Sequence, residues 1–121
     1  MVAQLRDVDG DLAIAPTAAL NGGTIAVAGN VTSAATSIIG SATIRLDGSG
    51  NQSLVSTAAS GVGRITSLVI DKSAGTLTLG DIAVYADWTH LAGNVDAAGS
   101  TVLFNGGTSS AIAAGGMSFD N

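Results

Sequence analysis

The fold is decided by one stretch, Ser67-Leu68-Val69-Ile70-Asp71-Lys72-Ser73-Ala74-Gly75-Thr76-Leu77-Thr78-Leu79. It holds two alternating segments, residues 67–71 and 76–79, in which the large aliphatic side chains lie two positions apart. Residues two apart in an extended chain share one face. The stretch therefore predicts two short β-strands joined by a turn at residues 73–75, each strand with an apolar inner face.

The same alternation recurs along the chain, whereas no long segment repeats apolar residues with the period of a helix. The positions predicted to face the interior are Ile25, Val27, Ile44, Leu46, Leu68, Ile70, Leu77, Leu79, Val102 and Phe104, joined by Ile82 and Val84. The intervening threonines, Arg45 and Leu103 are predicted to face outward. Short turns rich in Gly and Asn separate the strands, and these residues accept the left-handed backbone that sharp corners need.

Composition indicates a narrow interior. The chain has 121 residues, of which 46% are hydrophobic but only 3% aromatic, and it contains 17 Gly and no Cys. Aromatic side chains usually supply much of the buried area of a compact core. A single all-β unit over residues 1–121, thin and filled by small aliphatic side chains, fits this composition best.

An internal repeat favours a stacked solenoid over other all-β folds. The matching segments are residues 23–27 with 75–79, at an offset of 52; residues 29–31 with 93–95, at 64; and residues 43–48 with 101–106, at 58. We interpret this drift as an extra stretch between Leu79 and Gly93 within a unit of roughly 58 residues that holds two or three coils. Parallel stacking would bury one continuous aliphatic column. An antiparallel β-sandwich remains the alternative, because the same turns suit hairpins.

Two segments resemble repeats of very large bacterial surface and secreted proteins. Residues 43–53 and 68–79 are similar to repeats in adhesin, autotransporter-passenger and filamentous-haemagglutinin-like β-helices, and the likeness extends over residues 23–121. The resemblance implies a right-handed parallel β-helix, export to the cell surface or medium of a bacterium, and a structural or adhesive role. Residues 119–121 resemble the approach to another strand, so we expect a segment of a longer repeat protein, with other repeats or copies as end-to-end partners.

Net charge and the distribution of apolar residues disfavour several classes of function. Four Lys and Arg against nine Asp and Glu give a net charge of −5, which disfavours nucleic-acid binding because that needs a positive surface. No apolar run approaches the ~18 residues of a membrane-spanning segment. Residues 1–10 show no cationic start followed by an apolar stretch, so no signal peptide is expected there.

The densest acidic cluster is Asp7-Val8-Asp9-Gly10-Asp11. Alternate carboxylates at Asp7, Asp9 and Asp11 are ligands that Ca²⁺ accepts. The cluster departs from an EF-hand loop, since Leu12 and Ala18 stand where that loop needs Gly and Glu. Both a solvated turn and a calcium site therefore remain open, and no other cofactor is expected.

A second candidate site lies in the extra stretch, where Tyr85, Trp88 and His90 are close in sequence. Exposed aromatic rings can stack on sugars, which would make the chain a carbohydrate-binding module. The alternative is an aromatic plug or a lateral contact. For Asp47, Asp71 and Arg45 two interpretations stay open, a meeting on one outer face or a role as turn residues. Because no nucleophile, base and orienting group occur at recognisable spacing, we expect no enzyme.

Overall fold

The computed structural model describes residues 5–8, 10–16, 22–35, 40–59, 61–97, 99–104 and 112–113. Within these ranges the chain forms β-strands and no helix. The strands are β1 (Leu5–Val8), β2 (Leu12–Ile14), β3 (Thr24–Val27), β4 (Val31–Ser33), β5 (Thr43–Leu46), β6 (Gln52–Ser56), β7 (Gly63–Ile65), β8 (Ser67–Leu79), β9 (Ile82–Val84), β10 (Trp88–Asp96), β11 (Val102–Phe104) and β12 (Ile112–Ala113).

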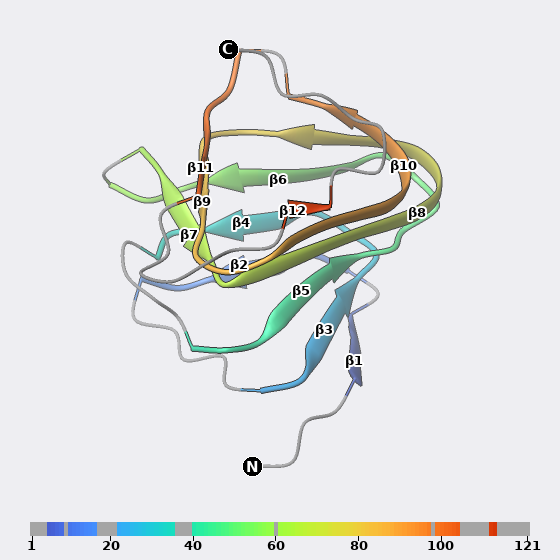
Figure 1. Cartoon of the computed structure of the whole chain (residues 1–121), viewed down its shortest axis with the longest axis horizontal. Helices are drawn as coiled ribbons and strands as arrows, with labels where there is room; N and C mark the ends of the chain where they lie inside the picture. The colour runs from blue at the N-terminus through green and yellow to red at the C-terminus, as the bar shows by residue number, and fades with distance from the viewer. Residues whose placement is uncertain are drawn as a thin grey trace.

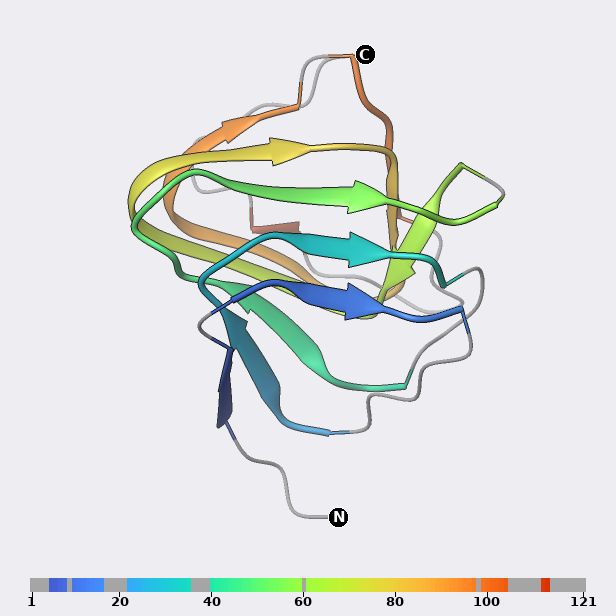
Figure 2. The same cartoon turned by 180° about the vertical axis from the view of Figure 1, so that it is seen from behind.

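Every described strand pairing is parallel, and the strands stack into a β-solenoid of about four turns. One face holds β1, β3, β5, the first part of β8 and β10, and β12, while a second holds β2, β4, β6 and the later parts of β8 and β10 (Figures 1 and 2). The third face holds β7, β9 and β11. This confirms the predicted parallel solenoid and excludes the antiparallel sandwich.

The coil is right-handed. In Figure 1 the near strands β3 and β5 point to the right, the far strands β4 and β6 point to the left, and successive coils rise from the N-terminus. Figure 2 shows the same sense from behind. Parallel strands joined by crossovers favour this hand because each strand has a right-handed twist.

The coil length corrects our interpretation of the repeat. Register partners lie between 18 residues apart, as for Leu77 and Val95, and 25 residues apart, as for Gln52 and Leu77. The offsets of 52 and 58 link strands on different faces, because β3 and β5 belong to the first face while residues 76–79 and β11 do not. The stretch between Leu79 and Gly93 is no insertion, since it supplies β9 and the start of β10.

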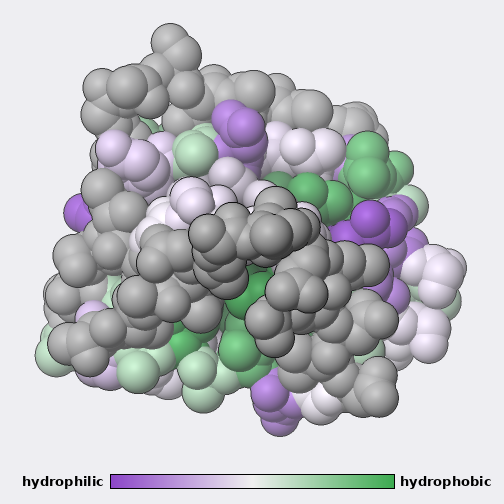
Figure 3. Space-filling view, turned by 90° about the horizontal axis from the view of Figure 1, so that it is seen from below, coloured by the Kyte–Doolittle hydropathy of each residue, from purple (hydrophilic) through white to green (hydrophobic). Residues whose placement is uncertain are grey.

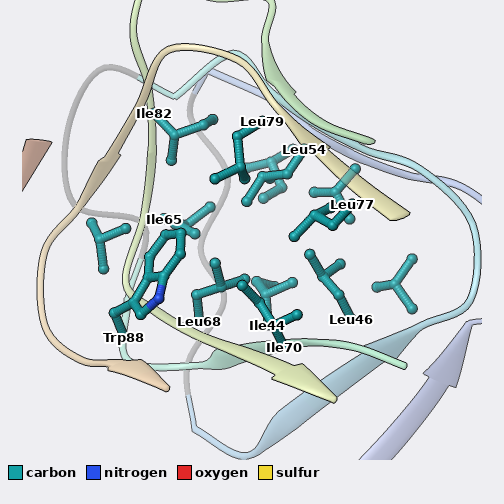
Figure 4. Close-up of a cluster of buried hydrophobic side chains, with 14 of the residues drawn as sticks. Ile44, Leu46, Leu54, Ile65, Leu68, Ile70, Leu77, Leu79, Ile82 and Trp88 are labelled. Atoms are coloured by element: carbon teal, nitrogen blue, oxygen red, sulfur yellow. The ribbon is translucent and has the colours of Figure 1, made fainter. Parts of the chain in front are cut away.

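A continuous aliphatic column fills the interior (Figure 4). Of the positions predicted to face inward, nine are buried, namely Val27, Ile44, Leu46, Leu68, Ile70, Leu77, Leu79, Ile82 and Val84. Ile25, Val102 and Phe104 are partly buried and contact this column. Leu103 is 42% exposed, as predicted. Full burial of each large side chain contributes about 1.5–3 kcal/mol, so the column is the main term that favours folding.

The deciding stretch forms one strand where two were predicted. β8 runs from Ser67 to Leu79 and bends from the first face to the second. Gly75, in the predicted turn, has a φ of +76°, a left-handed conformation that suits Gly. The sequence therefore predicted the position of the bend correctly. The strand is not interrupted there, because its backbone stays hydrogen-bonded to neighbouring strands on both sides of the bend.

Candidate functional site

Trp88 is buried, which favours the aromatic plug over the exposed ring that sugar binding would need. Its side chain is 0% exposed and meets Phe104 edge to face, with ring centroids 5.9 Å apart and an interplanar angle of 75°. The reason is register, since Trp88 opens β10 directly above Leu68 of β8, an inward position. In Figure 4 the indole lies beside Leu68 and Ile65. The ring therefore presents no face to a sugar and acts as the aromatic plug of the alternative interpretation.

The two other residues of the predicted aromatic site are half-buried. Tyr85 follows β9, and its backbone N–H donates to the carbonyl of Ile65 at 3.0 Å. His90 lies in β10, with Nε2 2.7 Å from the carbonyl oxygen of Gly93. Since Trp88 points into the core, these residues do not form the three-residue surface on which the carbohydrate-binding interpretation depends.

The acidic cluster is described only in part. Asp9 and the side chain of Asp7 lie outside the described residues. Oδ1 of Asp11 accepts a hydrogen bond from the backbone N–H of Asn30 at 2.8 Å, so this carboxylate joins two coils. Among the described residues no group of three His, Cys, Asp or Glu is placed to hold a metal. Calcium binding at this cluster therefore stays a prediction.

The three charged residues of the outer face do meet. Arg45 forms an ion pair with Asp71 through a terminal guanidinium nitrogen, and its Nε lies 4.0 Å from Asp47. These side chains are between 31% and 39% exposed, where such pairs contribute at most about 1 kcal/mol. The contact joins neighbouring coils on the outside of the first face.

The main polar feature of the described chain is a corner that sequence reasoning missed. Lys72 is 2% exposed, and its Nζ donates to the carbonyl oxygens of Gly48 and Gly50 and to Oε1 of Gln52, each at 2.7 Å. An ammonium group has three N–H donors, so every one of them finds an acceptor. A buried charge needs such partners to offset its loss of hydration.

Gln52 extends this corner to the coil below. Its Nε2 donates to the carbonyls of Val27, at 2.8 Å, and Gly29, while its Oε1 also accepts the backbone N–H of Gly48 at 2.9 Å. The side chain is 2% exposed. Three successive coils are thus joined by one buried hydrogen-bonded network, which we call the Lys72 corner and define by Val27, Gly29, Gly48, Gly50, Gln52 and Lys72.

Packing closes the corner from above. Gly93 has a φ of +104°, and a Cβ atom there would lie 2.7 Å from Cβ of Lys72. Only Gly fits such an approach without displacing the lysine stem. Burial lowers the pKa of Lys72 below its usual 10.5, and the negative charge of Asp47 offsets part of that shift.

The alternation of inward and outward residues in the sequence could have indicated this corner. Leu68 and Ile70 face inward, and the same period of two places Lys72 on the inner side of β8. In β6, Gln52 has the same relation to the buried Leu54. The inward positions predicted from the sequence were all aliphatic or aromatic, and neither Lys72 nor Gln52 was among them.

A second set of polar contacts, which we call the Asx ladder and define by Asp11, Asn30 and Asn51, links the coils near the start of the second face. Oδ1 of Asp11 accepts the N–H of Asn30, Oδ1 of Asn30 accepts the N–H of Ser53 at 2.9 Å, and Oδ1 of Asn51 accepts the N–H of Thr76 at 3.0 Å. At the next corner, Oδ1 of Asp81 accepts the N–H of Thr101 at 2.7 Å. Each carboxylate or amide satisfies a backbone donor of the coil above, where the chain turns and the strand ladder is interrupted.

Two further findings concern the chain as a whole. In the part of the chain that the structure describes, no helix is long and apolar enough to cross a membrane. Comparisons with protein-family models, with curated proteins and with solved structures find no match. The parallel β-solenoid is therefore established by the fold itself, and the resemblance to bacterial surface proteins stays a prediction.

Proposed function

We propose that this chain is a structural, non-catalytic segment of a bacterial extracellular β-solenoid, such as a surface adhesin, where it serves as a stiff stalk or scaffold. Further repeats or copies would continue it end to end. The observation that carries this proposal is the continuity of the interior from coil to coil, reinforced at the corners by the Lys72 corner and the Asx ladder.

A mechanical role is consistent with the way in which stability is distributed along a stack of coils. Each coil contacts mainly its neighbours, so the stability of a solenoid is close to a sum of coil and interface contributions. A buried network that spans three coils adds a connection between units that the backbone ladder joins only in pairs. Apolar surface lies within the end face of the coil nearest the N-terminus (Figure 3), where a further coil would extend the column.

Single-molecule pulling on the two ends of the chain tests the mechanical role. Coils of 18 to 25 residues should unravel in steps, and one coil should release about 60–90 Å of extended chain. We expect discrete force peaks, lowered in a Gln52→Leu variant that breaks the Lys72 corner. Smooth extension without a resolvable peak would contradict the proposal.

Labelling of intact cells of the source bacterium tests the location separately. Antibodies raised against the purified chain should bind unpermeabilised cells, or the culture medium should contain the parent protein. Signal only after permeabilisation would refute an extracellular role while leaving the fold untouched.

A further inference from the structure

We infer that the turn at residues 48–52 is a cation-binding cage whose native occupant is the ammonium group of Lys72, and that ammonium or another monovalent cation of similar size binds there once that side chain is removed. The inference goes beyond the structural role proposed above, which holds whether or not the cage accepts a free ion.

The geometry of the oxygens defines the site. The carbonyl oxygens of Gly48 and Gly50 and Oε1 of Gln52 converge on one point, the Nζ atom of Lys72, at 2.7 Å each. Ca²⁺ takes oxygen ligands at about 2.3–2.6 Å and Mg²⁺ at about 2.0–2.1 Å. The wider spacing suits an ammonium group or a large monovalent ion, for which backbone carbonyls replace the hydration shell.

The cage is held by contacts other than those to Lys72. Nε2 of Gln52 donates to Val27 and Gly29, which fixes the amide so that Oε1 faces the cage. The N–H of Gly48 donates to the same Oε1 at 2.9 Å. These contacts orient Oε1 of Gln52 and the Gly48 peptide without help from the ammonium group, so at least this part of the cage is preorganised.

The charge of the surroundings selects the class of ion. The three cage ligands are neutral oxygens, whereas divalent sites are built with carboxylates. Asp47 is the neighbouring acidic group that interacts with the Lys72 charge, and Nε of Arg45 lies 4.0 Å from the same carboxylate. A single, shared carboxylate near three neutral oxygens suits a monovalent ion better than a divalent one.

The space that a small ion needs is created by truncation. The Lys72 stem passes beneath Gly93, where a Cβ atom would come within 2.7 Å of it. In a Lys72→Ala variant this stem leaves a gap that leads to the cage. A Lys72→Met variant fills the gap with an uncharged side chain and is the matched control.

The test is chemical rescue of Lys72→Ala in thermal and urea unfolding. Chloride salts of ammonium, potassium and tetramethylammonium are compared at one ionic strength, so that general screening is equal. We expect the folding equilibrium constant of Lys72→Ala to rise in proportion to ammonium or potassium concentration above the dissociation constant. Tetramethylammonium, which is too bulky and has no N–H, should give no rise, and neither wild type nor Lys72→Met should distinguish the salts.

Equal stability of Lys72→Ala in all three salts would overturn the inference. If that variant is recovered unfolded, its refolding yield from urea in each salt replaces the melt, with the same expectation and the same refuting outcome. Wild-type protein gives a separate readout, because a caged ammonium should show a slowly exchanging NH₃⁺ signal by ¹⁵N nuclear magnetic resonance.

Discussion

Nζ of Lys72 lies 2.7 Å from Oε1 of Gln52, although the two residues are 20 positions apart in the chain. The contact places a buried cation between two coils and ties it, through the amide of Gln52, to a third. Such a group is costly to bury alone and favourable only when its partners are complete. The corner therefore makes the correct stacking of coils more stable than a shifted one.

Replacement of Gln52 by Leu should destabilise the protein by about 3 kcal/mol, because one acceptor of the Lys72 ammonium and the donors to Val27 and Gly29 are lost together. Urea unfolding measures the change. The double variant with Lys72→Met should lose less than the sum of the single changes, with a coupling of about 0.5–3 kcal/mol. Strict additivity would show that the two side chains act independently.

Replacement of Gly93 by Ala should cost more stability than replacement of Gly99 by Ala. Both glycines have positive φ, +104° and +77°, so both variants carry backbone strain of about 1–3 kcal/mol. Only at Gly93 would the new Cβ meet the Lys72 stem, since the Cβ position at Gly99 has no neighbour within 4 Å. Thermal melts of the pair isolate the packing effect, and equal losses would argue against close contact at the corner.

Trp88, the one tryptophan of the chain, reports directly on the core. Because its side chain is 0% exposed, its fluorescence should be blue-shifted and resistant to acrylamide in the native state, and both properties should be lost in urea. A Trp88→Ala variant should lose about 3–5 kcal/mol of stability. Water-like emission from the native protein would contradict burial and reopen the sugar-stacking interpretation.

Replacement of Asn30 by Ala should cost about 1 kcal/mol, because the N–H of Ser53 loses its acceptor. Asn30→Asp keeps an oxygen at this position and should retain most of the stability. Comparison of the two variants in urea separates the hydrogen bond from the side-chain volume. Equal losses of stability in both variants would show that the hydrogen bond from Ser53 to residue 30 does not stabilise the stack.

The sequence predicted the elements that follow from local alternation. Ile44 and Leu46, or Leu77 and Leu79, share a face by the period of two, and the structure buries all four. The parallel stack was predicted from internal similarity, but its register was not. Strands of similar composition lie on all three faces, so a match such as residues 43–48 with 101–106 does not identify which strands are stacked.

The candidate site was predicted less well, because the sequence left the sugar-binding surface and the aromatic plug both open and assigned no role to Lys72 or Gln52. Trp88 is a plug, since register places it above Leu68. Lys72 is buried because three oxygens, all from the coil below, compensate its charge, and no local pattern reveals a partner 20 to 24 residues away. Contacts across coils depend on coil length, which varies from 18 to 25 residues and which composition does not specify.

Engineered disulfides between β5 and β8 test the parallel stack most directly, since the chain has no cysteine of its own. Register pairs Thr43 with Ser67 and Arg45 with Val69, at partly exposed positions. Neighbouring strands lie about 4.8 Å apart, within disulfide reach, while the crossed pairs would be separated by about 8 Å. We predict that the 43/67 and 45/69 double-cysteine variants oxidise readily and keep the native melt, and that the 43/69 and 45/67 variants do not. Preferential bonding of the crossed pairs would show antiparallel strands and contradict the solenoid.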